Sequence, residues 1–237
     1  MSTHFRIARA VPRFVPSGGG TTYNSVLTAL TPSARWKHDE STGTTAVAAV
    51  GTDGTYVPGG APQNQAVTLG VTSLVADGGT AISTGNGSYV DLPVPTLTTA
   101  GTLILWMAAG VGGGNGIPFW RDNTSNNGWF MDISQTNPVV RVNGTNHTVS
   151  TVTASTLRDG FRHMYVLTTD GSTVKLYIDG SLVDTWTKAA AFSTINTSIR
   201  LGKNGAGTGG YAGTFDDTAI INSAISATDV SNLWAAS

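Results

Sequence analysis

The chain has no cysteine among its 237 residues. This absence excludes disulfide bridges, thiolate zinc sites and a cysteine nucleophile, and it makes the chain indifferent to the redox state of its compartment. Glutamate is almost absent as well, because Glu40 is the only one. A helical cytosolic enzyme would carry many more Glu and Lys residues, so the composition points away from that class.

Charge and long apolar runs are also scarce. Charged residues make up 11% of the chain and the formal net charge is −1, which leaves no bulk electrostatic attraction for nucleic acid or for a membrane surface. No apolar run reaches membrane-spanning length, and the first residues lack the apolar core of a signal peptide. We therefore expect neither nucleic acid nor membrane as a partner, and expect export, if any, within an assembly or by lysis.

The sequence carries no catalytic signature. No two histidines are spaced as metal ligands, and we expect His38 and His163 to be strand residues with satisfied hydrogen bonds. No Gly-x-Ser-x-Gly elbow is present, and the glycine run 112–116 is not followed by the lysine and helix of a phosphate-binding loop. The prediction is a protein that is not an enzyme.

Turn-forming residues are abundant, with 30 glycines, and the clearest pattern lies between Arg162 and Gly180. Apolar residues there alternate with polar ones on both sides of Asp170-Gly171, and Asp179-Gly180 follows the second run. Asp-Gly tolerates the positive φ angles of tight hairpin turns. The stretch predicts an antiparallel hairpin.

Further strands are expected along the chain, between short turns. The segment 102–109 is continuously apolar and predicts a central buried strand, whereas 41–63 reads as a loop. A short helix is expected from Asn24 or Ser25 to Pro32, and a second one begins at Ser226. The other predicted strands are 34–39, 65–69, 80–83, 88–92, 117–121, 128–134, 138–143, 146–152, 161–185 as a hairpin, 199–202 and 211–221. Ten to thirteen short strands predict an all-β protein, a two-sheet antiparallel sandwich.

Residues 1–22 differ from the rest and form a separate segment ahead of a sandwich over 23–237. Arginines alternate with large apolar residues, prolines exclude a helix, and three glycines follow as a hinge. So many apolar residues are unusual for a solvated tail. We expect an extended arm that packs on a partner, through Phe5, Arg6, Ile7, Arg9, Arg13 and Phe14.

Three blocks of the sequence resemble the laminin-G-like branch of the concanavalin A-like lectin/glucanase superfamily. They are SVLTALTPSARWKHDESTGTTA (25–46), DGGTAISTGNGSYVDLP with GTLILWM (77–107), and the stretch from FRHMYVLTTDGSTVKLYIDG to the closing FDDTAIINSAISATDVSNLWAA (161–236). The resemblance implies a concanavalin A-like jelly-roll sandwich with a short C-terminal helix. Domains of this type recur in bacteriophage tail and capsid accessory proteins.

The chain departs from this family at its chemical motifs. Calcium-binding members carry Asp-Ser-Ser-Gly where this chain has Val47 to Gly51, which offers no side-chain oxygen. We expect no cofactor, although the resemblance keeps calcium open. The glucanase Glu-x-Asp-x-x-Glu strand cannot exist with a single glutamate. The best acidic pair, Asp216 and Asp217, should point to opposite faces of a strand, and the resemblance makes Asp216 a structural residue that ties loop amides at the sheet edge.

One loop has the composition of a sugar site. Two tryptophans flank a run of amide and carboxylate side chains, and a pyranose offers an apolar face to a ring and a polar rim to hydrogen-bonding groups. An ordinary polar hairpin loop between buried tryptophans explains the same pattern. The loop from Lys203 to Tyr211 is a second candidate. The residues of the first are Trp120, Asp122, Asn126, Asn127 and Trp129.

The sequence therefore leaves two candidate functions. The first is a non-enzymatic structural component of a phage virion, a capsid decoration or tail accessory protein at the virion surface. Its arm would bind major capsid or tail subunits, and the chain would form a homo-oligomer. The second is a carbohydrate-binding module for host surface glycans. Both are compatible in one protein.

Overall fold

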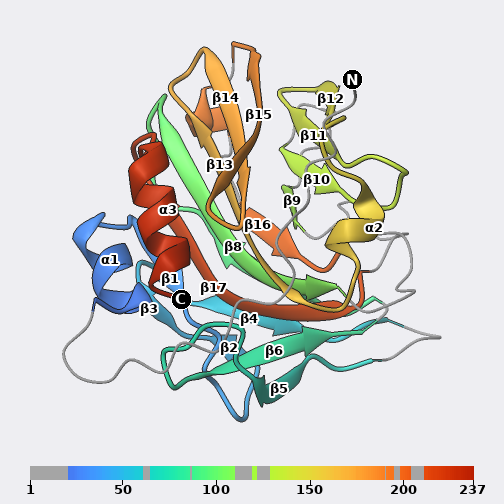
Figure 1. The fold of residues 1–237 in the computed structure, drawn as a ribbon. Helices are drawn as coiled ribbons and strands as arrows, with labels where there is room; N and C mark the ends of the chain where they lie inside the picture. Colours follow the sequence, from blue (N-terminus) through green and yellow to red (C-terminus); the bar gives the residue numbers. More distant parts are fainter. Residues whose placement is uncertain are drawn as a thin grey trace.

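The computed structural model describes residues 21–60, 65–85, 87–109, 119–121, 129–189, 191–194, 198–203 and 211–237. Two antiparallel sheets pack face to face, as the alternating strands predicted, and helices lie on one outer side (Figure 1). The architecture is the expected jelly-roll sandwich with a short C-terminal helix. The arm residues Phe5, Arg6, Ile7, Arg9, Arg13 and Phe14 lie outside the described residues.

The nine-stranded sheet has the order β15-β14-β13-β8-β17-β1-β3, with β6 pairing to β17 and β5 to β6. Its central strand β8 is the continuous apolar run foreseen from the sequence, and it is buried on both sides. The strands are β1 (Ala34–Trp36), β3 (Ala48–Val50), β5 (Thr68–Thr72), β6 (Thr80–Thr84), β8 (Gly101–Ala109), β13 (Arg162–Thr169), β14 (Thr173–Ile178), β15 (Ser181–Thr187) and β17 (Gly213–Ile221).

The eight-stranded sheet has the order β12-β11-β10-β9-β16-β7-β4-β2. Each of its strands is short, and each pairing in it is antiparallel. The strands are β2 (Thr45–Ala46), β4 (Gly54–Val57), β7 (Tyr89–Pro93), β9 (Phe119–Arg121), β10 (Phe130–Asp132), β11 (Val139–Val142), β12 (Thr145–Thr148) and β16 (Ser198–Leu201).

The predicted hairpin is confirmed. β13 and β14 pair antiparallel around Asp170-Gly171, where Gly171 has a φ of +99° and the Asp170 carboxylate accepts hydrogen bonds from the backbone of Ser172 and Thr173. Asp179 and Gly180, both with positive φ, then turn the chain into β15. The local sequence alone was sufficient here because the turn chemistry lies within four residues.

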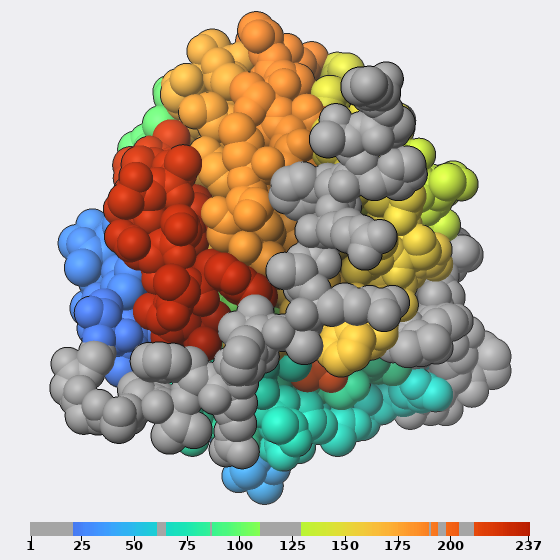
Figure 2. All heavy atoms as spheres, in the orientation of Figure 1, coloured from blue at the N-terminus to red at the C-terminus, as the bar shows by residue number. Residues whose placement is uncertain are grey.

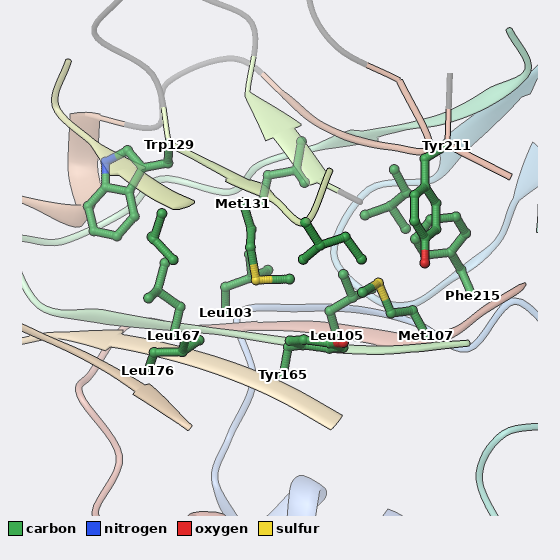
Figure 3. Packing of buried hydrophobic residues seen from close by; sticks show 14 of the residues in the cluster. Leu103, Leu105, Met107, Trp129, Met131, Tyr165, Leu167, Leu176, Tyr211 and Phe215 are labelled. Carbon is green, nitrogen blue, oxygen red and sulfur yellow. The ribbon is translucent and has the colours of Figure 1, made fainter. Parts of the chain in front are cut away.

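Apolar side chains from both sheets meet in the main core. Figure 3 shows Trp129 and Met131 of one sheet facing Leu103, Leu167 and Leu176 of the other. This core encloses a cavity of about 10 Å³, which is room for roughly one water molecule. The cavity is therefore too small for an organic ligand.

A second core lies between the nine-stranded sheet and two helices, α1 (Tyr23–Ala29) and α3 (Ala227–Ala235) (Figures 1 and 2). The Trp106 ring meets Tyr23 edge-on and stacks on Trp234 of α3. α3 begins at Ser226 as expected, in a capping box with Asp229. A single turn, α2 (Ala154–Leu157), and the 3₁₀ turn Phe192–Thr194 complete the described helices.

Three local expectations were wrong. α1 is capped by Thr22, because its side chain and that of Ser25 exchange hydrogen bonds with each other's backbone N–H. The first strand ends at Trp36, and His38 adopts a positive φ of +61° outside any strand. The segment 41–63 holds β2, β3 and β4; strands of two to four residues are too short to show a period and are defined by their pairing.

Candidate functional site

The outer face of the eight-stranded sheet, on the side away from the core, carries a set of polar and aromatic side chains. Neighbours along these strands point into the core, as Val90, Leu92, Ile199 and Leu201 do. Alternation in a strand therefore turns the residues between them outward. Most of the outward residues are half-buried or exposed, whereas Phe130 is only 8% exposed, and no helix among the described residues packs on them. They are Thr55, Tyr89, Asp91, Phe130, Asp132, Arg141, Asn146 and Arg200.

Cross-strand pairing places most of these residues in one row. The register joins β4, β7, β16, β9, β10, β11 and β12 without a gap. The partners follow one another as Thr55, Asp91, Arg200, Trp120, Phe130, Arg141 and Asn146. Directly opposed residues on adjacent strands lie about 4.5–5.5 Å apart. The row thus forms one continuous surface across seven strands, which we call the outer-face row.

Cations lie over aromatic rings on both sides of Trp120, the centre of the row. On one side, the Arg141 guanidinium lies over the Phe130 ring, with its carbon 5.4 Å from the ring centroid. On the other side, the ring of Tyr89, two positions before Asp91 in β7, has Arg200 at 5.4 Å and the Lys203 ammonium at 4.7 Å from its centroid. Such cation–π contacts orient long side chains and hold them near the surface.

One ion pair sits inside the row. The Arg200 Nε atom lies 3.6 Å from Asp91 Oδ2, and both side chains are partly exposed. Because water screens such a pair, it adds little to stability. The two groups therefore remain suited to exchanging partners with a ligand that brings hydroxyl or carboxylate oxygens.

The arrangement combines what a sugar ligand requires. Aromatic surface accepts the apolar face of a pyranose, and guanidinium and carboxylate groups hydrogen-bond its hydroxyls. The described carboxylates of the face are Asp91, paired with Arg200, and Asp132, whose Oδ1 accepts a hydrogen bond of 2.7 Å from the Ser134 backbone.

The structure describes only part of the predicted sugar loop. The backbone of Trp120 lies in β9, paired with Arg200 and Phe130, at the centre of the outer-face row. Asp122, Asn126 and Asn127 lie outside the described residues.

The expectation for Trp129 requires a correction. Trp129 is 1% exposed and packs edge-on against Phe192. Figure 3 shows its ring among the side chains of the main core. The ring immediately precedes β10, whose alternation turns Met131 inward and Phe130 outward. Trp129 is a core residue here and offers no platform to a ligand in solvent.

The structure also corrects the expected geometry of the acidic pair. A β-bulge in β17 falls between Asp216 and Thr218, so both carboxylates lie on the helix-covered side of the sheet. Asp216 accepts hydrogen bonds from the backbone of Leu74 and Val75 and from the Asp217 backbone N–H. Its predicted structural role of tying loop amides is confirmed, although β17 lies inside the sheet, between β8 and β1, and not at its edge.

Neither carboxylate of this pair is available for chemistry. Asp216 is 2% exposed and Asp217 is fully buried. Burial raises the pKa of Asp216 to about 6, although its hydrogen bonds act in the opposite direction. Asp217 is held by the Arg35 guanidinium, whose Nε atom donates to Asp217 Oδ1 at 2.9 Å. Both groups are saturated with partners inside the fold.

Two histidines have hydrogen-bond partners on both ring nitrogens. His38 contacts Tyr56 and Thr218, and His163 contacts Asp179 and Asp159. The expectation that both histidines have hydrogen-bond partners is confirmed. His163 also lies in a strand, as expected, whereas His38 does not. In the described part of the chain, no three His, Asp or Glu side chains gather into a group that could hold a metal ion.

The acidic turn after β1 is balanced by a lysine. Lys37 Nζ lies 3.9 Å from a carboxylate oxygen of Asp39 and 3.9 Å from one of Asp77. Asp39 also accepts a hydrogen bond from the Thr80 backbone. These carboxylates thus have an ammonium and an amide as partners.

Reasoning from the sequence missed Tyr89, Asp91, Arg141 and Arg200. The available signal was weak: each is a polar or aromatic residue alternating with buried Val, Leu or Ile in a strand of four or five residues. Such a pattern predicts a solvated strand face. Only the register between strands places these residues in one row.

Comparison with known proteins supports the fold. Residues 84–231 match a laminin-G-like family model described as the concanavalin A-like lectin/glucanases superfamily. The chain belongs to this superfamily. No curated protein shows significant similarity to it.

Solved structures with the same fold include domains of two larger proteins. Domain 4 of AbnA, an extracellular GH43 arabinanase from Geobacillus stearothermophilus solved with arabinotriose, is 16% identical with a TM-score of 0.61; the match covers 85% of this chain and 97% of that one. The botulinum neurotoxin serotype G binding domain is 13% identical with a TM-score of 0.61, over 86% of this chain and 50% of that one. The chain therefore spans about half of that toxin domain.

A third structure is the binding domain of botulinum neurotoxin DC in complex with rat synaptotagmin II. It is 16% identical with a TM-score of 0.58, over 86% of this chain and 51% of that one. At these identities the likeness defines a shared lectin-like sandwich. No helix among the described residues is long and apolar enough to cross a membrane.

Proposed function

We propose that this protein is a carbohydrate-binding module that binds glycans on the outer face of its eight-stranded sheet. The observation that carries the proposal is the outer-face row, in which Arg200, Phe130 and Arg141 follow one another through the register around the backbone of Trp120. Rings flanked by guanidinium groups suit a ligand with apolar faces and many oxygens. The Geobacillus domain solved with arabinotriose spans nearly the same length, which favours a sugar as the ligand class.

A panel of oligosaccharides tests this proposal by calorimetry on the full chain. We expect binding to at least one glycan, and we expect Arg200→Gln to weaken it about tenfold or more, because a lost charged hydrogen bond costs roughly 1.5–3 kcal/mol. Lys175→Gln is the matched control, since it removes an exposed cation from the other sheet. Equal affinities of the Arg200→Gln variant and the wild type would contradict the site.

We propose further that the module binds without cleaving. The single glutamate, Glu40, accepts hydrogen bonds from the Val47 backbone and the Tyr56 hydroxyl, and the buried Asp216 and Asp217 are engaged as described above. In the part of the chain that the structure describes, this leaves no pair of carboxylates a few ångströms apart beside the row. Mass spectrometry of each bound glycan after prolonged incubation should show an unchanged chain length.

The second proposal concerns assembly. It rests on the sequence of residues 1–22, where arginines alternate with large apolar residues. In this proposal the protein is a virion surface component, and the arm adds to a neighbouring capsid or tail subunit or to a sister copy.

Light scattering after size exclusion compares the full chain with residues 23–237. We expect an oligomer for the full chain and a monomer for the truncation, both with the same cooperative unfolding. In a reconstituted particle, deletion of residues 1–17 should prevent incorporation. Normal incorporation of the deleted form would end the assembly proposal without affecting the glycan proposal.

A further inference from the structure

Among the residues whose side chains the structure describes, those in and beside the outer-face row carry more positive than negative charge, unlike the chain as a whole. The chain carries 13 basic and 14 acidic residues. The described charged residues in and beside the row are three cations, Arg141, Arg200 and Lys203, and two carboxylates, Asp91 and Asp132. This surface therefore favours a ligand with negative charge.

The two described carboxylates reduce this preference little. Asp132 accepts a hydrogen bond from the Ser134 backbone N–H, and Asp91 lies beside Arg200. Among the described residues, no ion pair includes Lys203. A negatively charged ligand would thus meet the Lys203 ammonium beside Tyr89 and the guanidinium groups of the row.

The spacing of the two arginines suits an extended ligand. Arg141 of β11 and Arg200 of β16 are separated by β10 and β9, so three inter-strand steps of about 4.8 Å place their backbones about 14 Å apart. The Phe130 ring lies in this interval. A chain of several sugar rings can contact both arginines together, whereas a single small anion cannot.

Both arginines also suit one kind of charged group. The guanidinium is planar and presents donors in a fixed fork that matches a carboxylate with two parallel hydrogen bonds. Each lies over an aromatic ring, Phe130 or Tyr89, which restricts its orientation before a ligand arrives. Less conformational freedom is then lost on binding.

We infer that the outer-face row binds acidic oligosaccharides, in which carboxylates of uronic acid residues pair with Arg141 and Arg200. This inference rests on the proposed carbohydrate-binding function and names its ligand class. Lys203, over Tyr89, extends the positive surface toward the end of β16. The partly exposed Tyr89 ring, beside Arg200, offers a contact surface to the sugar rings.

The test compares each acidic ligand with its own neutral form. Hexamers of galacturonate, and oligosaccharides of alginate and hyaluronan, are titrated into the full chain by calorimetry beside their methyl esters. Arabinotriose and other neutral oligosaccharides complete the panel. We expect at least one acid to bind about tenfold or more tighter than its ester, with an affinity that falls as salt is added.

Variants then show which residues give the preference for the acid over its ester. Arg141→Gln and Arg200→Gln should each reduce the preference for the acid over its ester, whereas Lys175→Gln, on the other sheet, should leave it unchanged. Thermal unfolding of each variant shows that the sandwich is intact. Arg200→Lys retains the charge without the planar fork, and intermediate binding by it would support paired hydrogen bonds.

The outcomes separate the inference from the proposed function. Esters or neutral glycans that bind as tightly as the acids would overturn the inference and leave the carbohydrate-binding function in place. Acid binding that survives both Gln substitutions would place the charge recognition elsewhere and would also overturn the inference. Absence of binding across the entire panel would overturn the proposed function and the inference with it.

Discussion

The Nδ1 atom of His38 lies 3.3 Å from the hydroxyl oxygen of Tyr56, and this contact joins the two sheets of the sandwich. Tyr56 belongs to β4 of the eight-stranded sheet and donates its own proton to Glu40. The Tyr56 oxygen therefore accepts from His38 Nδ1–H, which leaves Nε2 to accept from Thr218 of β17 at 3.2 Å. A neutral imidazole thus connects both sheets inside the protein.

This buried imidazole predicts loss of stability in acid. Burial lowers the pKa of His38 to about 3, from an ordinary value of 6.5. The unfolded chain takes up the proton more readily, so the contribution of His38 to stability is complete above pH 6.5 and is lost as the pH falls toward about 3. At about pH 5 the expected loss is roughly 2 kcal/mol in the free energy of unfolding.

Chemical denaturation across this pH range measures the effect. His38→Asn is the matched variant, because Asn tolerates the positive φ of this position and does not titrate. The variant should be less stable at neutral pH and should show a flatter dependence on pH. Parallel curves for the two proteins would contradict the assignment.

A second histidine should act in the opposite direction. Burial by itself lowers the pKa of His163, but hydrogen bonding to Asp179 and the charges of Asp179 and Asp159 outweigh it, so the pKa is raised. Both ring nitrogens face carboxylates, at 2.7 and 3.3 Å, and the imidazolium is the form that donates to both. Its stabilising effect is therefore complete below the ordinary pKa of 6.5 and is lost as the pH rises through the folded-state pKa.

The titration of His163 can be followed directly by NMR of its ring protons. We expect a midpoint above that of a model peptide, and Asp179→Asn should shift the midpoint downward. His163→Gln should cost more stability at pH 6 than at pH 8.5. A midpoint at or below the value of the peptide would show that the two carboxylates do not outweigh burial.

The buried pair of Arg35 and Asp217 should be sensitive to the loss of one partner. Their side chains are 4% and 1% exposed, so removal of either charge leaves the other uncompensated inside the protein. Asp217→Asn is expected to lower the free energy of unfolding by about 3–5 kcal/mol.

A double-mutant cycle separates the pair from its surroundings. Arg35→Met combined with Asp217→Leu removes both charges, and this double variant should regain much of the stability that Asp217→Asn loses. Additive losses in the double variant would show that the two side chains act independently.

Trp129 should affect stability rather than ligand binding. Its ring is enclosed in the main core and meets Phe192 edge-on. Trp129→Ala should lower the free energy of unfolding by about 3–5 kcal/mol, whereas Trp129→Phe should cost less. If the Trp129→Phe protein is folded, its affinity for a bound glycan should equal that of the wild type, and a selective loss of affinity would return Trp129 to the binding site.

Several features of this protein follow from short stretches of sequence. The apolar run that became β8, the Asp-Gly turns around β14 and the capping box at Ser226 each depend on residues within a few positions of one another. Local backbone preferences and side-chain hydrogen bonds suffice for such elements, so their position and type were predictable. The laminin-G-like sandwich follows from their order along the chain.

The site depended on the tertiary structure. Arg141 and Arg200 are 59 positions apart by number, and only strand register brings them into one row around the backbone of Trp120. The burial of Trp129 and the bulge that turns Asp216 and Asp217 to the same side arise in the same way. A shift of one residue in register exchanges the inner and outer faces of a strand. The sequence by itself therefore determined that this protein is a sandwich of antiparallel strands, while contacts between distant strands decided which of its side chains face a ligand.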